Sequence, residues 1–206
     1  MVKTDLTGKI LYTLGNVDKE SDTAQKFDFV NPTDVAVAPN GDIYIVDGYG
    51  SFKMHRFDKN FRFIKTIGTK GKAHGEFSNN HGVWINTLKK EPELYVADRG
   101  NSRIEVYSLE MEYKRTHGEV RKPCCFYQHD GLLWIPDLQK RITVYDADDK
   151  VAAQLGDSQG VDEKQIEQHP DKFAQPHALC LSSTGDLYVV EWLPYGRVRK
   201  FKHTPV

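Results

Sequence analysis

Apolar and polar residues alternate along most of the chain, in short runs that turn-forming residues separate. The stretch DVAVAPNGDIYIVDGYGSFKMHRFD (34–58) holds three such runs, joined by an Asn-Gly turn and by a polar loop. Alternation with a period of two is typical of a strand with one buried face, and Asn-Gly between two runs is a hairpin signal. The pattern therefore predicts antiparallel strands and an all-β fold.

This unit of strands is repeated. Further copies cover 82–108, 124–147 and 178–202, and an additional run that ends in glycine, such as FIKTIG or VAAQLG, follows the earlier copies. Four short antiparallel strands repeated about every 40–50 residues match a β-propeller blade and not a helical solenoid. We predict one propeller domain over 1–206, with an N-terminal strand at about 8–15 and repeats at about 30–68, 79–118, 120–156 and 174–206.

The two ends of the chain bear on how the blades are arranged. The last copy stops after its third strand, and the run GKILYTLG (8–15) stands alone before the first copy. One interpretation is a closed ring of four four-stranded blades, in which this N-terminal strand completes the last blade and removes the exposed edges. The other is that the four blades are part of a larger propeller, whose first blades lie outside this sequence.

Composition and charge narrow the class of protein. Hydrophobic residues make up 39% of the chain, and the formal net charge of −1 lacks the basic surplus that nucleic-acid-binding proteins usually carry. No apolar run reaches the roughly 18 residues of a membrane span, so we expect neither a nucleic-acid partner nor a span. The start MVKTDLTGKILYTLG has no apolar core of signal-peptide length. We expect a cytoplasmic protein, or a secreted or periplasmic one if the true N-terminus is missing.

Two histidines stand just before apolar runs, His81 in NNHGVWIN and His177 in QPHALCLS. Each opens the first strand of a copy, and Cys124 holds the aligned position in the third copy. The first strand of a blade runs nearest the axis, so in a four-bladed ring these three residues would converge there. Two imidazoles and a thiolate are an accepted zinc set, which makes them a candidate metal site. The alternative is that they are buried core residues with no ligand role.

Tyr49 and Arg99 lie in loops that follow second strands. Because the second strand is antiparallel to the first, these loops lie at the same end of the molecule as the starts of the first strands. We therefore expect Tyr49 and Arg99 to face the same central funnel. The third and fourth copies carry Leu138 and Trp192 in these loops, so Tyr49 and Arg99 depart from the repeat, as functional residues do. Trp192 is expected to pack in the core or within its loop.

An acidic residue ends every second strand. Its recurrence in all four copies indicates a structural role, which we expect to be hydrogen bonding to amides of the loop that follows. These acids are Asp47, Asp98, Asp137 and Glu191. The histidines outside the funnel, among them His55, are expected to be solvated.

Four segments resemble NHL-repeat propellers: PTDVAVAPNGDIYIVDGYG (32–50), HGVWIN (81–86), LYVADRGNSRIEVY (94–107) and PHALCLSSTGDLYVVE (176–191). More narrowly, they resemble the peptidyl-α-hydroxyglycine α-amidating lyase family and its bacterial relatives. The resemblance runs from about Gly8 to Phe201. That family is six-bladed, so the resemblance implies part of a six-bladed propeller that lacks the first blades.

The resemblance also implies a site and a reaction. In the lyase family, histidines that open alternate blades hold a zinc ion near the axis, and a tyrosine and arginines lie beside it. By motif these positions are His81, His177, Tyr49 in the DGY loop and Arg99 in the ADR loop. The implied enzyme is a zinc-dependent carbon–nitrogen lyase that cleaves a peptidyl-α-hydroxyglycine, or a related carbinolamide, into an amide and glyoxylate. The resemblance also admits calcium as a cofactor.

The sequence departs from the family pattern in three ways. The blades that would supply a third histidine and a further arginine lie outside it, Ala178 replaces an aspartate that often follows the last histidine, and a PCC opening replaces PTD. The alternatives are a non-catalytic NHL propeller that binds a peptide, protein or glycan in its funnel, or an inactive truncated homologue. The partner is thus a small peptide or amide-type substrate, or a protein, and the oligomeric state stays open.

Overall fold

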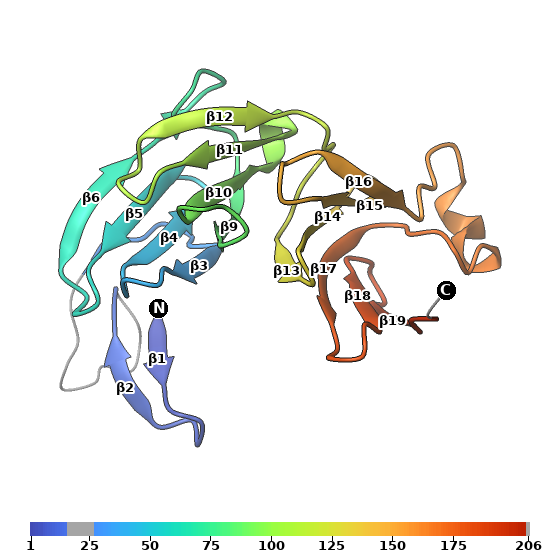
Figure 1. The fold of residues 1–206 in the computed structure, drawn as a ribbon, viewed down its shortest axis with the longest axis horizontal. Helices are drawn as coiled ribbons and strands as arrows, with labels where there is room; N and C mark the ends of the chain where they lie inside the picture. Colours follow the sequence, from blue (N-terminus) through green and yellow to red (C-terminus); the bar gives the residue numbers. More distant parts are fainter. Residues whose placement is uncertain (16–26, 205–206) are drawn as a thin grey trace.

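Four antiparallel sheets follow one another around an arc in the computed structural model (Figure 1), which describes residues 1–15 and 27–204. In each sheet the strands are joined in sequence order, as in a propeller blade. The predicted all-β propeller is therefore confirmed. Residues 205 and 206, at the end of the predicted fourth repeat, lie outside the described residues. No helix in the described ranges is long and apolar enough to cross a membrane.

The blades are built from the following strands. The first contains β3 (Asp34–Val37), β4 (Ile43–Asp47), β5 (Lys53–Phe57) and β6 (Phe63–Ile67). The second contains β9 (Asn80–Asn86), β10 (Glu93–Asp98), β11 (Arg103–Tyr107) and β12 (Tyr113–His117). The third contains β13 (Tyr127–His129), β14 (Leu132–Asp137), β15 (Arg141–Tyr145) and β16 (Val151–Leu155). The fourth, three-stranded over the described residues, contains β17 (Pro176–Leu181), β18 (Leu187–Glu191) and β19 (Arg197–Phe201). The connections hold short β7 (Thr69–Lys70) and β8 (Glu76–Phe77) and the 3-10 helices η1 (Arg99–Asn101) and η2 (Glu163–Gln168).

The hydrophobic core lies between neighbouring blades. Successive side chains of a strand point to opposite faces, so each sheet can present apolar residues to the blades on both sides. Tyr44, Val46 and Met54 of the first blade pack against Val83 and Leu94 of the second. Equivalent clusters join the second blade to the third and the third to the fourth. Each buried side chain of this kind stabilises the fold by roughly 1.5–3 kcal/mol, which fixes the blades and the loops at their ends.

The N-terminal strand does not close a four-bladed ring. β1 (Val2–Thr4) and β2 (Ile10–Thr13) pair with each other, and Leu14 packs against Ile43 on the face of the first blade turned away from the second. Figure 1 shows this hairpin beside the first blade and away from the fourth. The chain turns back at Gly8, where φ is +86°, so the local pairing forms with a short loop. The predicted four-bladed closure is therefore wrong.

A buried acid ends each second strand and binds the segment that leads into the first strand of its blade. Asp98 accepts a hydrogen bond from the Ser78 amide at 2.7 Å, and Asp137 accepts one from the Lys122 amide at 2.5 Å. The other pairs are Asp47 with the Val30 and Asn31 amides, and Glu191 with the Ala174 and Gln175 amides. The predicted structural role is right, but these amides belong to the segment ahead of the blade. The predicted bond to the following loop is present in the third blade, where Asp137 also accepts from the Gln139 amide at 3.3 Å.

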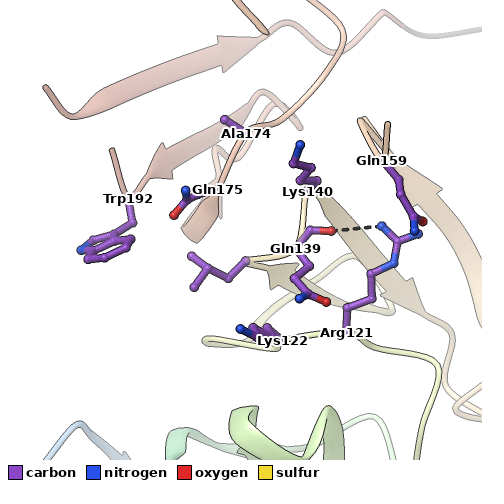
Figure 2. Close-up of a pocket in the computed structure, with 9 residues that line it drawn as sticks. Arg121, Lys122, Gln139, Lys140, Gln159, Ala174, Gln175 and Trp192 are labelled. Carbon is purple, nitrogen blue, oxygen red and sulfur yellow. Dashed lines mark hydrogen bonds between the residues drawn. The ribbon is translucent and has the colours of Figure 1, made fainter. Parts of the chain in front are cut away.

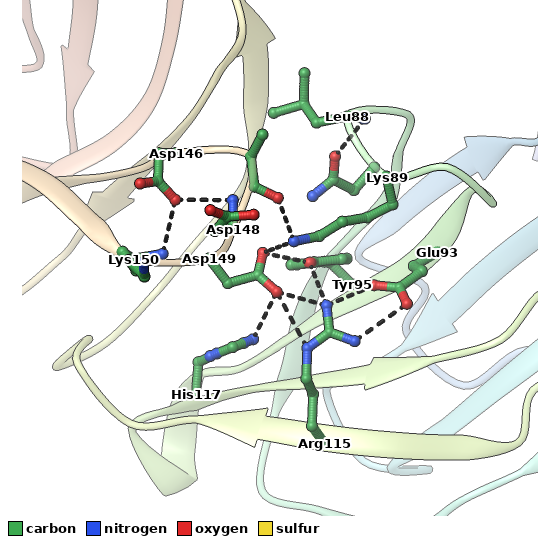
Figure 3. A network of polar contacts seen from close by, with 12 residues as sticks. Leu88, Lys89, Glu93, Tyr95, Arg115, His117, Asp146, Asp148, Asp149 and Lys150 are labelled. Carbon is green, nitrogen blue, oxygen red and sulfur yellow. Dashed lines mark hydrogen bonds and ion pairs between the residues drawn. The ribbon is translucent and has the colours of Figure 1, made fainter.

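A polar network joins the second and third blades at the end opposite the starts of the first strands (Figure 3). Asp149, in the β15–β16 turn, accepts from the Tyr95 hydroxyl at 2.6 Å and pairs with Lys89 at 2.9 Å and Arg115 at 2.5 Å. Arg115 also pairs with Glu93 at 2.5 Å. Burial acts to raise the pKa of Asp149, but the hydrogen bonds to its oxygens outweigh it and lower the pKa. Every charge in this network has an opposite partner.

Candidate metal centre

Three ligand-type side chains from three blades meet at the end of the molecule where the first strands begin. His81 is the second residue of β9, His177 is the second residue of β17, and Cys124 lies shortly before β13. Their ligand atoms, imidazole nitrogens and the thiol sulfur, all lie within 4.8 Å of one another. The two imidazole rings meet edge to face, with centroids 4.9 Å apart. The structure thus brings together the three residues that sequence analysis named as candidate ligands.

Buried acids anchor the chain just ahead of each candidate ligand. Ser78, whose amide Asp98 binds, precedes His81 by three residues. The third and fourth blades repeat this arrangement ahead of Cys124 and His177. Hydrogen bonds to an ionised carboxylate are roughly twice as strong as neutral ones, so the backbone that delivers each ligand is held firmly.

A glycine lets the second and third blades approach closely at the centre. A Cβ atom at Gly82 would lie 2.5 Å from the carbonyl oxygen of Cys124, closer than real atoms come. Nδ1 of His81 lies 2.8 Å from the same oxygen. Because a carbonyl only accepts hydrogen bonds, Nδ1 carries the proton and Nε2 keeps its lone pair. Metal-binding histidines usually donate their second ring N–H in this way.

Burial sets the protonation of the three side chains. It lowers the pKa of His81 to about 4, and the hydrogen bond to the Cys124 carbonyl offsets only part of this effect. Burial, and then the charge of Arg99, also lower the pKa of His177. Both imidazoles are therefore neutral at pH 7, the form that binds metals. Burial raises the pKa of the Cys124 thiol, so a metal ion would have to displace its proton.

The donor set fits zinc. Zinc takes nitrogen ligands at about 2.0–2.1 Å and thiolate sulfur at about 2.3 Å, so a tetrahedral ion needs its donors roughly 3.3–3.8 Å apart. The donors here lie within 4.8 Å, and a shift of about 1 Å would bring them to that spacing. Three protein ligands leave a fourth position open, as catalytic zinc sites do. Calcium prefers about six to eight oxygen ligands, which these residues do not provide.

Tyr49 and Arg99 lie beside the three candidate ligands. Nη2 of Arg99 donates to the Tyr49 hydroxyl at 2.6 Å, and Nη1 lies 3.8 Å from Sγ of Cys124. The Tyr49 ring is edge-on to the His81 imidazole, with centroids 5.8 Å apart. Within the described part of the chain, no carboxylate pairs with Arg99, whose partners are a phenol and a thiol. Its positive charge is therefore available to an anionic ligand.

Two further glycines allow the loops that carry Tyr49 and Arg99 to reach the centre. Cβ atoms at Gly48 and Gly100 would lie 2.3 and 2.0 Å from backbone oxygens of residues 78–80, the segment that leads into β9. Tyr49 directly follows the first of these glycines, and Arg99 directly precedes the second. This role of the glycines was not predicted, although the sequence shows a glycine beside each of these two residues.

Two side chains outside the centre contradict their predictions. His55, expected to be solvated, is only 4% exposed, and its Nδ1 bonds to the Thr66 hydroxyl at 2.8 Å. Burial lowers its pKa to about 4. Trp192, expected to pack in the core or its loop, is 67% exposed. His55 packs against Phe27 and Phe29 of the segment ahead of the first blade, a contact that the alternation pattern alone does not reveal.

Comparison with known proteins decides the family. The sequence model of a family described as a 6-bladed β-propeller matches residues 22–178, most of the chain. The chain belongs to this 6-bladed β-propeller family. The described residues of the propeller form four blades, which agrees with the interpretation that they are part of a larger ring.

Two relatives bear on the kind of propeller. The propeller is 33% identical to human NHL repeat-containing protein 3 over 102 residues, which cover 48% of this chain and 28% of that protein. It is 33% identical to a probable peptidyl-alpha-hydroxyglycine alpha-amidating lyase of Caenorhabditis elegans over 104 residues, which cover 50% and 29%. The resemblance to NHL repeats and to the lyase family is therefore confirmed. The matched segments span less than a third of either relative.

Solved structures share the fold. Virginiamycin B lyase from Staphylococcus aureus has a TM-score of 0.57 and 12% identity, covering 96% of this chain and 61% of that one. A streptogramin B lyase has a TM-score of 0.55 and 13% identity, covering 96% and 59%. At such low identity, the likeness establishes the propeller architecture alone.

Proposed function

We propose that the funnel is the active site of a zinc-dependent carbon–nitrogen lyase that cleaves a peptidyl-α-hydroxyglycine, or a related carbinolamide, into an amide and glyoxylate. One observation carries the proposal. Arg99, a cation without a carboxylate partner among the described residues, lies between Tyr49 and the Cys124 of a three-residue metal-ligand cluster. The name of the Caenorhabditis elegans relative, a probable lyase of this class, supports the same reaction.

His81, Cys124 and His177 would hold the zinc ion. Bound zinc would supply Lewis-acid stabilisation of charge on a substrate oxygen. The hydrogen bond from His81 to the Cys124 carbonyl fixes the imidazole orientation and leaves Nε2 for the metal. Tyr49 touches His81 and Arg99 touches Cys124, so both would lie beside a substrate that the zinc ion held.

Arg99 would bind the carboxylate of the substrate. A guanidinium and a carboxylate form paired hydrogen bonds that set both position and orientation. Nη1 of Arg99 faces only the Cys124 thiol at 3.8 Å, a weak acceptor that a carboxylate oxygen would replace. Nη2 would keep its bond to Tyr49 and hold that side chain beside the bound substrate.

Tyr49 would take up or orient the proton of the substrate hydroxyl. Its hydroxyl, held by Arg99 at 2.6 Å, would in ionised form take the proton of the substrate hydroxyl and in neutral form orient that hydroxyl. As the carbon–oxygen double bond of glyoxylate forms, the carbon–nitrogen bond breaks and its electron pair moves to the nitrogen. That nitrogen takes up one proton and becomes the amide, so the reaction balances without another reactant.

A non-catalytic propeller is the second candidate. The match to NHL repeat-containing protein 3 favours it, since the name of that protein states a repeat and no reaction. The same funnel, with the 47% exposed Tyr49 at its rim, would then dock a peptide, a protein or a glycan. An inactive truncated homologue would keep the fold and bind neither zinc nor substrate.

Release of glyoxylate tests the proposal. Zinc-loaded protein is incubated with an N-acyl-α-hydroxyglycine, and glyoxylate is measured by NMR. We expect zinc-dependent turnover that Arg99→Met and Tyr49→Phe reduce, while the exposed Arg62→Met control does not. No glyoxylate above the rate of the chelator-treated protein would reject the lyase and leave the binding propeller.

A further inference from the structure

A cavity lies between the third and fourth blades, at the end of the molecule where the metal centre lies (Figure 2). Its volume is about 480 Å³, within the range of small-ligand pockets. It is lined by Arg121, Lys122, Leu138, Lys140, Gln175 and Trp192, among others. Figure 2 shows Trp192 and Gln175 on one side and the lysines on the other. The reaction proposed above does not use this cavity.

The walls of the cavity are the same backbone segments that carry the metal ligands. Lys122 precedes Cys124 by two residues, and its carbonyl oxygen lies 3.6 Å from Sγ of Cys124. Gln175 precedes His177 by two residues, and its carbonyl accepts the Trp192 amide at 2.8 Å. The cavity therefore borders the two segments that deliver Cys124 and His177 to the metal centre.

The loops of the cavity correspond to the catalytic loops of the other blades. Leu138 follows Asp137, and Trp192 follows Glu191, as Arg99 follows the acid of its own blade. The second blade thus presents a cation at this position, whereas the third and fourth blades present large apolar side chains. At the funnel end of the molecule, the loops of the third and fourth blades, with Leu138 and Trp192, therefore form an apolar half, and the loop with Arg99 belongs to a polar half.

The apolar half lacks packing. Trp192 is 67% exposed, and its indole makes no ring contact with other aromatic residues in the described ranges. Contact with an apolar or aromatic group of a ligand would remove this indole from water, which is favourable. Leu138, half-buried, lines the same cavity. These two residues favour a ligand with an apolar or aromatic side chain.

The cavity is also positively charged. Three of its lining residues are basic, and none is acidic. Asp157 pairs with Arg121 and offsets that charge, with contacts of 2.6 and 3.1 Å. Lys140 donates to the neutral carbonyl of Val161 at 2.8 Å, and no ion pair to Lys122 occurs within residues 1–15 and 27–204. The charges of these two lysines therefore favour an anionic group on the ligand.

We propose that this cavity binds the peptide on the amino side of the bond that is cleaved, with a large apolar side chain against Trp192 and an acidic side chain near Lys122 and Lys140. The position relative to the reacting atoms rests on the proposed lyase function, because the substrate carboxylate is assigned to Arg99. The preferred substrate is therefore an acidic-aromatic peptidyl-α-hydroxyglycine, which should be cleaved faster than a short N-acyl-α-hydroxyglycine.

Substrate selectivity tests the assignment. The zinc-loaded protein is given three substrates: N-acetyl-hydroxyglycine, and hydroxyglycine preceded by Glu-Phe or by Lys-Ala. We expect kcat/KM to be about tenfold or more higher for Glu-Phe than for the other two, a ratio in the range that one pocket contact supplies. Trp192→Ala should reduce this ratio at least fivefold, and Lys122→Glu should shift the preference toward Lys-Ala. The Tyr195→Ala control, exposed but outside the cavity, should leave the ratio unchanged.

A binding experiment separates the failure of this assignment from the failure of the lyase. The polarisation of a fluorescent Glu-Phe-Gly peptide is measured with the same variants. Binding that Trp192→Ala and Lys122→Glu weaken would support the cavity even if no substrate releases glyoxylate. Glyoxylate release without selectivity, or selectivity that neither variant changes, would overturn the cavity and leave the lyase standing. No peptide binding and no selectivity would overturn it as well.

Discussion

Two arginines of the second blade, Arg99 and Arg115, act at opposite ends of the same sheet. They differ in whether acidic side chains surround them. Arg115 lies between Asp149 and Glu93, with ion-pair distances of 2.5 Å to each. Arg99 contacts a phenol and a thiol, and no carboxylate of the described residues pairs with it. A charge that is fully paired stabilises a fold or breaks even, whereas an unpaired charge beside ligand-type residues is suited to a ligand.

Removal of the charge of Asp149, which pairs with Arg115, should give the largest loss of stability. Asp149→Asn keeps the side-chain shape, and Asn tolerates the positive φ of 64° at this position, but it leaves Arg115 and Lys89 without their shared partner. We expect a loss of about 3 kcal/mol in the free energy of unfolding, measured by urea denaturation with an unchanged slope. The exposed neighbour Asp148→Asn should change it by less than about 0.5 kcal/mol. An equally small change for both variants would mean that the ion pairs of Asp149 do not stabilise the fold.

Removal of the unpaired charge of Arg99 should lower the activity and leave the stability nearly unchanged. Arg99→Met should lower kcat/KM for glyoxylate release by about 100-fold to 1000-fold, since it deletes a charged contact to the substrate. Its free energy of unfolding should stay within about 0.5 kcal/mol of the wild-type value. A loss of stability as large as that of Asp149→Asn, with turnover retained, would mean that Arg99 is structural as well.

The contact of the second and third blades at the centre offers a smaller test. Gly82→Ala would push the Cys124 carbonyl away, because the new Cβ would lie 2.5 Å from its oxygen. The hydrogen bond that orients His81 would weaken, and we expect zinc affinity to fall by about 10-fold to 100-fold. Competition with a chromogenic chelator measures this. At Gly118 an added Cβ meets nothing within 4 Å, so Gly118→Ala should bind zinc as the wild type does.

Protonation of His55 at acidic pH should lower the free energy of unfolding, which is the smallest of these effects. The pKa of His55 is about 4 in the folded protein and near 6.5 when unfolded, so the unfolded chain binds more protons between these values. Stability is therefore lost as the pH falls from about 6.5 to about 4, and at pH 5 His55 accounts for about 1–2 kcal/mol. In zinc-free protein, His55→Asn should flatten this part of the pH profile, and the exposed His203→Asn should not. Identical acid limbs for all three proteins would contradict the burial of His55.

The residues that met at the centre could be predicted from sequence because the repeat itself carries the geometry. Aligned positions of successive blades are related by rotation about one axis. His81, Cys124 and His177 were therefore expected to converge in a four-bladed ring, and they meet even though the N-terminal strand does not close that ring. The same rule placed Tyr49 and Arg99 at that end of the molecule. No pairwise spacing within one blade would have predicted these contacts.

Contacts that the repeat does not encode were predicted wrongly or were not predicted. One of the two interpretations placed the first run at the far edge of the last blade, but a hairpin at Gly8 lets it pair locally and cover apolar side chains of the first blade. Every buried acid binds an amide ahead of its blade, because the chain passes the end of the second strand before it enters the first, and Asp137 alone of the four is also bound by a backbone amide of the following loop in the described residues. The role of Gly82 depends on a distance between two blades, which alternation along one chain cannot express.

The central claim is that His81, Cys124 and His177 form one metal site, and elemental analysis of the purified protein tests it most directly. The wild type is loaded with zinc, passed over a desalting column and compared with His81→Ala, Cys124→Ala and His177→Ala. We predict close to one zinc ion per chain in the wild type and a small fraction of that in each variant. Absence of zinc from the wild type, or full occupancy in Cys124→Ala, would contradict the account.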